Sequence, residues 1–148
     1  MDLSKVKLDA LTVTELRTLK QRMEEDLRVF LQTDTNFVEL QMNYSASKVL
    51  VDSLIKTEDK PQQVMIPLSS SLFIPGQIKD KNRFIVDIGT GYFAERDAKQ
   101  TMEYCDQTNE VIATNLQGVR AEIQKKKTFL DQININLQKT VLKSQGIN

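Results

Sequence analysis

The 148-residue chain has no histidine, no tryptophan and a single cysteine, Cys105. Without histidine there is no imidazole base, so a Ser-His-Asp triad and a histidine-ligated zinc site are both excluded. A lone cysteine forms neither an internal disulfide nor a Cys-x-x-Cys centre. These absences remove most hydrolase and metalloenzyme classes. We therefore predict a protein that is not an enzyme, with no catalytic, cofactor-binding or metal-binding residues.

An excess of charge of one sign is also lacking. The chain has 20 Lys plus Arg and 20 Asp plus Glu, which give a formal net charge of zero. Because no net positive field attracts polyanions, we do not expect nucleic acid as a partner. No stretch approaches the 18 apolar residues of a membrane span, and charged residues occupy the positions where a signal peptide needs its apolar core. We expect a cytoplasmic protein with no membrane partner.

Glycine and proline are scarce in both flanks of the chain. Residues 1–60 contain neither, and residues 95–145 contain only Gly118. Thr12 and Glu15 have the spacing of a capping box, in which each side chain satisfies a backbone N–H at a helix start. We predict a helix over about 13–57, two β-hairpins over about 63–94 and a second helix over about 95–144. The whole chain, residues 1–148, is then a single α+β domain.

Both predicted helices carry apolar residues in a seven-residue repeat. In the first helix the a positions start at Leu16 and the d positions at Leu19; in the second helix they start at Met102 and Cys105. Most of these positions are apolar, which predicts a coiled coil. Folding back into an intramolecular antiparallel pair has the smaller entropic cost. The alternative is two separate intermolecular coiled coils.

Two core positions of this repeat are polar. Asp26 falls at a d position of the first helix and Lys126 at a d position of the second. Polar residues at such positions fix register and pairing at some cost in stability. The sequence leaves open whether these two side chains meet.

The centre of the chain consists of short β-rich runs separated by turn residues. Pro75-Gly76 has the residue pattern of a type II turn. Gly89-Thr90-Gly91 is typical of a hairpin turn or bulge, and it lacks the further glycine, the Gly-Lys-Ser/Thr and the following helix of a phosphate loop. Several strands are apolar at consecutive positions, so both faces require burial that one chain does not supply. We therefore predict an obligate oligomer assembled through Val64, Ile66, Leu68, Leu72, Ile74, Phe84, Val86, Ile88, Tyr92 and Phe93.

Two segments of this centre resemble the hairpin signature of the alpha-class subunits of prefoldin. They are QQVMIPLSSSLFIPG at residues 62–76 and VDIGTGYFAE at residues 86–95. The resemblance implies an alpha2 beta4 heterohexamer with other prefoldin subunits, whose alpha-class hairpins build a central β-barrel platform. It also implies an ATP-independent co-chaperone that captures unfolded actin and tubulin chains at its coiled-coil tips and delivers them to the cytosolic chaperonin.

The two ends of the chain hold further apolar residues outside the firm heptads. An antiparallel helix pair would bring these ends together, and apolar surface of this kind binds other apolar chains. We predict that the unfolded client is bound by Leu3, Val6, Leu8, Leu11, Val141 and Leu142. The alternative function is a coiled-coil scaffold or tether that binds folded partners.

Overall fold

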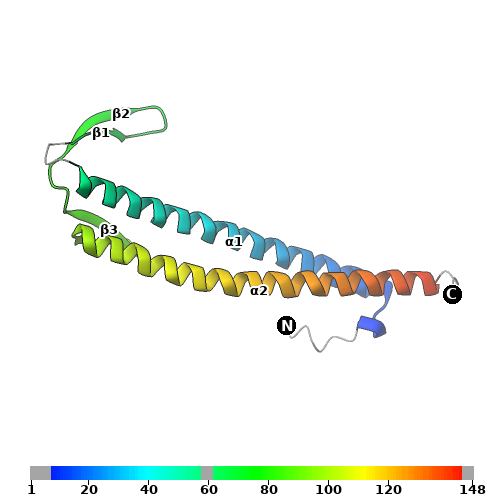
Figure 1. Ribbon diagram of the computed structural model, residues 1–148. Coiled ribbons are helices and arrows are strands. Elements are labelled where there is room, and N and C mark those ends of the chain that lie inside the picture. The colour runs from blue at the N-terminus through cyan, green and yellow to red at the C-terminus, as the bar shows by residue number, and fades with distance from the viewer. Residues whose placement is uncertain (1–7, 58–61, 145–148) are drawn as a thin grey trace. The chain divides into compact units, whose positions relative to one another are not determined.

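The computed structural model describes residues 8–57 and 62–144 (Figure 1). Two long helices flank two antiparallel strand pairs, which confirms the predicted fold class. None of the described helices is long and apolar enough to cross a membrane. In chain order the elements are the short 3-10 helix η2 (Leu8–Ala10), α1 (Val13–Lys56), β1 (Gln62–Pro67), β2 (Phe73–Ile78), β3 (Phe84–Gly89), β4 (Tyr92–Arg96) and α2 (Ala98–Ser144).

The chain forms two compact units. Among the described residues, the first unit comprises 8–39 and 113–144, and the second comprises 40–57 and 62–112. Each helix therefore contributes one part to each unit. The hairpins belong to the second unit, and η2 belongs to the first.

Both long helices begin with a reciprocal cap. At α1 the backbone N–H of Thr12 donates to Glu15 Oε2 at 2.8 Å, and the N–H of Glu15 donates to Thr12 Oγ1 at 3.3 Å. This confirms the predicted capping box. At α2 the N–H of Gln100 donates to Asp97 Oδ1 at 2.7 Å, and the N–H of Asp97 donates to Gln100 Oε1 at 3.2 Å. The helix consequently starts at Ala98, slightly later than the predicted start near residue 95, and β4 continues to Arg96.

The first of these caps depends on the charge of Glu15. The backbone N–H and the hydroxyl of Thr12 both donate to its carboxylate and hold the pKa of Glu15 below its ordinary value of 4.5. A carboxyl whose folded-state pKa is lowered stabilises the fold fully above its ordinary pKa. This contribution is lost as the pH falls through the lowered value.

In the first unit α1 and α2 run antiparallel. Lys126 Nζ lies 2.9 Å from Asp26 Oδ2, and Arg120 Nε lies 2.7 Å from Asp34 Oδ1, so the partner numbers fall along α2 as they rise along α1. The ammonium of Lys126 also lies 5.0 Å from the centre of the Phe30 ring. The two polar core residues therefore do meet, which the sequence had left open.

The second unit shows the same antiparallel pairing. Lys48 Nζ lies 2.6 Å from Asp106 Oδ2. One turn away, the side-chain amide of Asn109 donates to Ser45 Oγ at 3.3 Å. The intramolecular helix pair is thus present in both units.

The predicted heptad positions are all covered in α2, whereas in α1 the a column is covered and only part of the d column is. In α2 every predicted a and d position is buried or half-buried. In α1 the a column that starts at Leu16 is likewise covered, but the predicted d residues Asp26, Leu40 and Ser47 are exposed. The second covered column of α1 lies one residue further along and consists of Lys20, Leu27, Asp34, Gln41 and Lys48. Because most of this column is polar, apolar periodicity did not reveal it.

The predicted turn at Pro75-Gly76 is wrong, because these residues lie within the first hairpin's second strand. β1 and β2 pair from Gln62 opposite Ile78 to Pro67 opposite Phe73, so Pro75 and Gly76 lie within the strand. The turn falls instead over the three serines, where the N–H of Leu68 donates to the carbonyl of Leu72 at 2.8 Å. A Cβ on Gly76 would stand 2.5 Å from Ile66 Cδ1. Glycine serves here to make room for a cross-strand side chain.

The second hairpin closes on Gly89-Thr90-Gly91, as predicted. Gly89 pairs with Tyr92, which leaves Thr90 and Gly91 as the two central residues. Their φ angles are 52° and 82°, and positive φ at both positions is the mark of a type I′ turn. The register also shifts between Asp87 and Gly89, so a bulge accompanies the turn.

The core of the first unit is formed by the start of α1 and the later turns of α2. Leu16 and Ile133 are fully buried at 0% exposure. η2 packs into the same core, where Leu8 is only 8% exposed. The cluster consists of Leu8, Leu16, Met23, Phe129, Leu130 and Ile133, with Leu11, Leu19, Leu27 and Leu137 packed against it.

The Asp26–Lys126 pair yields a test of its energetic role. Lys126 is 8% exposed, whereas the side chain of Asp26 is 54% exposed. We expect Asp26→Ala to lower the free energy of unfolding by about 1 kcal/mol, because it leaves a covered ammonium without its counter-charge. Lys126→Met should be neutral or stabilising, because only the ammonium is covered and an apolar side chain often replaces a covered charge without loss of stability.

The measurement is equilibrium urea denaturation followed by far-UV circular dichroism. Lys125→Met is the matched control, because this neighbouring lysine is exposed and pairs with Glu122 within one turn of α2. Its effect should stay within about 0.5 kcal/mol. A Lys126→Met variant that is clearly less stable than the wild type would show that the ion pair stabilises the fold.

Candidate functional site

The hairpins present the largest set of exposed apolar side chains in the second unit. In the first hairpin, cross-strand pairs alternate between two faces. One face carries the half-buried Val64 and Gly76, together with Ile66 and Ile74 at 43% and 41% exposure. The opposite face is exposed throughout and includes Met65, Pro75, Pro67 and Phe73.

The second hairpin is divided in the same way. Its half-buried face consists of the pairs Phe84 with Arg96 and Val86 with Ala94. Its exposed face includes Ile85 at 72% and Phe93 at 67%. Beside the turn, Ile88 and Tyr92 are also exposed. One face of this hairpin is therefore covered by its own chain, and the other is uncovered.

The predicted assembly residues divide accordingly. Val64, Phe84 and Val86 are half-buried within this chain, so they contribute to its own packing. The other predicted residues are exposed, and these are Ile66, Leu68, Leu72, Ile74, Ile88, Tyr92 and Phe93. The structure adds three exposed side chains that the sequence reading missed, Met65, Phe73 and Ile85. The prediction missed them because it selected alternate residues of each apolar run. The strand register places these three side chains on the exposed faces.

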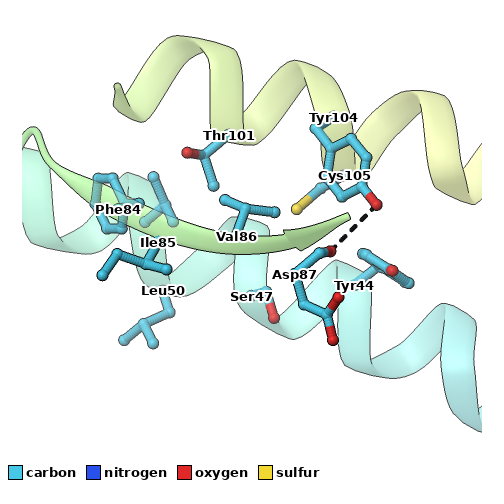
Figure 2. Close-up of a pocket in the computed structure, with 11 residues that line it drawn as sticks. Tyr44, Ser47, Leu50, Phe84, Ile85, Val86, Asp87, Thr101, Tyr104 and Cys105 are labelled. Atoms are coloured by element: carbon cyan, nitrogen blue, oxygen red, sulfur yellow. Dashed lines mark hydrogen bonds between the residues drawn. The ribbon is translucent and has the colours of Figure 1, made fainter. Parts of the chain in front are cut away.

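Polar and aromatic contacts attach the second hairpin to the helices (Figure 2). Tyr104 on α2 donates its hydroxyl to the backbone carbonyl of Asp87 at 3.3 Å. The guanidinium of Arg96 lies 5.1 Å from the centre of the Tyr104 ring, and the Tyr44 ring of α1 meets that ring edge-on at 6.2 Å. Asn82 accepts the first N–H of α2, from Ala98, at 3.0 Å. These contacts fix which hairpin face is turned outward.

An apolar cleft of 340 Å³ lies between β3 and the two helices of the second unit (Figure 2). Cys105 lines this cleft and is 3% exposed. Burial, followed by the negative charge of Asp106, raises the pKa of the Cys105 thiol above its ordinary value. The other lining residues are Tyr44, Ser47, Leu50, Val51, Phe84, Ile85, Val86, Asp87, Thr101 and Tyr104.

The buried thiol should be unreactive in the folded protein. Since the thiolate is the nucleophile, burial and a raised pKa both slow alkylation. We expect iodoacetamide at mildly alkaline pH to modify Cys105 at least about a hundredfold more slowly in native protein than in urea-denatured protein. Mass spectrometry over time measures both rates. Equal rates would show that this part of the second unit opens freely.

The predicted client-binding residues do not all form an exposed surface. Leu8 is buried in the first-unit core and Leu11 is half-buried against it, so the expectation of two exposed apolar side chains there is wrong. Both leucine side chains point into the first unit because they complete its apolar cluster. Leu142 is 48% exposed, and Val141 is half-buried. Leu3 and Val6 lie outside the described residues.

One backbone amide of the glycine-rich turn is hydrogen-bonded within its own hairpin. The N–H of Gly89 donates to Asp87 Oδ1 at 2.8 Å, so this amide is already satisfied by an acidic side chain. Within residues 8–57 and 62–144, no group of three or more acidic or cysteine side chains is arranged to hold a metal ion. Two features that bear on function are the apolar hairpin surface and the apolar core of the first unit.

Two heptad-patterned helices joined through two small antiparallel hairpins define a coiled-coil protein with a strand-bearing centre. The sequence profile of the prefoldin family, described as "Prefoldin subunit", matches residues 23–143. The chain therefore belongs to the prefoldin family, as an alpha-class subunit similar to prefoldin subunit 5.

Individual relatives agree with this assignment. "Probable prefoldin subunit 5" of Drosophila melanogaster is 27% identical over 128 residues, covering 86% of this chain and 76% of that protein. "Prefoldin subunit 5" of Homo sapiens is 21% identical over 121 residues, covering 82% and 78%. Among solved structures, filamentous PFD from Methanocaldococcus jannaschii superimposes with a TM-score of 0.63 at 14% identity, covering 82% of this chain and 98% of that chain. At that identity the structural match shows the fold alone.

Proposed function

We propose that this chain is one of two alpha-class subunits in an alpha2 beta4 heterohexamer that captures unfolded polypeptides and passes them to the cytosolic chaperonin without using ATP. The proposed clients are unfolded actin and tubulin chains, and the proposed location is the cytoplasm. The observation that carries the proposal is the exposed apolar face of the hairpins in a chain of the prefoldin family.

The exposed strands support assembly with other subunits. Ile85, Tyr92 and Phe93 are each about two-thirds exposed or more, and all three lie on one small hairpin. Both two-stranded sheets also have open edges, whose backbone groups pair readily with strands of another chain. A small sheet with uncovered apolar side chains is stabilised when partner strands cover it. Assembly through the hairpins satisfies both requirements together.

The capture mechanism would be multivalent. A single helix-pair end offers a small apolar surface with weak affinity, and several ends in one complex multiply the effective binding of a single client. Non-native chains expose the apolar side chains that folded proteins bury, so such ends need no sequence-specific pocket. Weak individual contacts also permit release without a nucleotide.

The decisive experiment combines native mass spectrometry with an aggregation assay. The chain is affinity-purified from cells, the mass of the intact complex is measured and the co-purifying chains are identified. The same complex is then mixed with denatured actin diluted into buffer, and light scattering is recorded with and without ATP. We expect a complex of six small subunits that suppresses scattering equally under both conditions.

The control distinguishes client capture from tethering of folded proteins. Native folded actin replaces denatured actin in a pull-down with the same complex. Retention of the denatured form alone supports the proposal. A complex that retains only folded partners, or a chain that purifies as a monomer, would instead favour the scaffold function.

A further inference from the structure

The apolar cluster of the first unit is completed by a segment that precedes α1. Leu16 and Ile133 are fully buried, and Phe129 and Leu130 are 6% and 8% exposed. Leu8 is a member of this cluster, and Leu11 packs against it. Part of the burial of the helix pair therefore comes from residues 8–11, which lie outside both long helices.

This segment is attached to the core mainly through its side chains. Its backbone forms one turn, in which the N–H of Leu11 donates to the carbonyl of Leu8 at 3.3 Å. The hydrogen bonds that the described part of the chain shows for residues 8–12 all stay within residues 8–16. Displacing the segment would break no hydrogen bond between it and α2 among those described. Within residues 8–57 and 62–144, the contacts that hold this segment on the core are therefore those of the apolar side chains of Leu8 and Leu11.

The cap of α1 would survive such a displacement. Thr12 and Glu15 satisfy each other's backbone N–H groups locally, so the helix start does not depend on where residues 8–11 lie. The chain bends at Leu11, directly before Thr12. The segment can therefore change its direction at this bend while the capped start of α1 stays intact.

We propose that the end of the first unit is an acceptor site for short peptide segments with two aliphatic side chains three positions apart, occupied in this structure by the chain's own residues 8–11. Side chains at i and i+3 of a 3-10 turn lie on the same side, which is how Leu8 and Leu11 both reach the cluster. A client segment with the same spacing replaces them. The inference rests on the proposed function and deepens it, because it names the kind of client segment bound and makes the chain's own segment its competitor.

The site can be tested directly with a peptide. A labelled peptide of residues 1–12 is titrated into the purified complex carrying either the wild-type chain or the Leu8→Ser/Leu11→Ser variant, and fluorescence anisotropy is recorded. The resident segment is present at a high effective concentration, so it should reduce binding to the wild type. We expect the variant to bind the peptide at least about tenfold more tightly. Equal affinities would overturn the proposal.

Matched controls separate this site from general apolar attraction. A peptide with serine at positions 8 and 11 should not bind the variant. Ile135→Ser removes an aliphatic side chain that is 51% exposed on α2, and it should leave peptide affinity at the wild-type value. Circular dichroism verifies helix content, and the milder Leu8→Ala should shift the affinity in the same direction by a smaller factor. If the Leu8→Ser/Leu11→Ser variant bound the peptide with the same affinity as the Ile135→Ser control, the proposal would also be overturned.

A second arm uses denatured actin and distinguishes this proposal from the proposed function. If the segment competes with clients, Leu8→Ser/Leu11→Ser lowers the concentration of complex needed to suppress light scattering by about threefold or more. A rise in that concentration would mean that the two leucines themselves hold the client, and it would overturn the competition. If neither complex suppresses scattering, client capture fails, and the peptide titration alone decides whether the site exists.

Discussion

Ile133→Ala should lower the free energy of unfolding by about 3 kcal/mol. The side chain is 0% exposed at the centre of the first-unit cluster, and removing a buried isoleucine leaves a cavity as well as losing its apolar burial. Equilibrium urea denaturation followed by far-UV circular dichroism measures the change.

Ile135→Ala provides the matched control, two residues further along the same helix. Its side chain is 51% exposed, and the substitution brings the same gain in helix propensity. The change should stay within about 0.5 kcal/mol, so the difference between the two variants isolates burial. Similar losses at both positions would mean that the cluster does not stabilise the helix pair.

Replacing Leu72 and Phe93 with serine should abolish co-purification of the partner subunits. Both side chains are exposed in this chain, at 56% and 67%, so the substitutions remove apolar contact area without opening a cavity. If they are interface anchors, each lowers the association free energy by about 2 kcal/mol, or roughly 30-fold in affinity. Native mass spectrometry of the affinity-purified chain gives the composition directly.

Val49→Ser is the control for this experiment. Val49 is 68% exposed on α1 in the same unit and lies outside the hairpins. Its substitution should leave the complex intact, and circular dichroism should show unchanged helix content in all variants. Undiminished co-purification of the Leu72 and Phe93 variant would remove the hairpin surface as the site of assembly.

The sequence predicted the fold well where apolar periodicity and capping residues agree. Thr12 and Glu15 located the start of α1, and the heptads of α2 identified its covered face. The same reasoning missed the second covered column of α1, because Lys20, Asp34 and Gln41 are polar. Long polar side chains can cover a helix seam with their stems, and hydropathy patterns do not detect this.

Local residue patterns were less dependable in the hairpins. Pro75-Gly76 matches a turn, yet the strand continues through it because Ile66 packs into the space that Gly76 leaves open. This reason is a cross-strand contact, so it is invisible in the local sequence. In contrast, Gly89-Thr90-Gly91 formed the predicted turn, because positive φ angles there depend on the residues themselves.

The sequence predicted that the candidate site is an apolar surface, but it identified only some of the residues that form it. Consecutive apolar strand residues indicated a surface that requires a partner, but the register was needed to assign Ile85 to the exposed face. The position of Leu8 was not predictable, because a short segment before a helix carries no periodicity that shows where it packs. Its burial became visible only with the helix pair in place.

The pairing of the first unit also determines when the chain can complete its fold. Asp26 and Lys126 are 100 residues apart, whereas Lys48 and Asp106 of the second unit are 58 apart. At a synthesis rate of about 5–20 residues per second, the early part of α1 waits about 5–20 s for its partner residues to be translated. During that interval the apolar side chains of Leu16 and Met23 lack the contacts that later bury them. Each newly made chain therefore passes through the same incomplete state as the clients proposed for it.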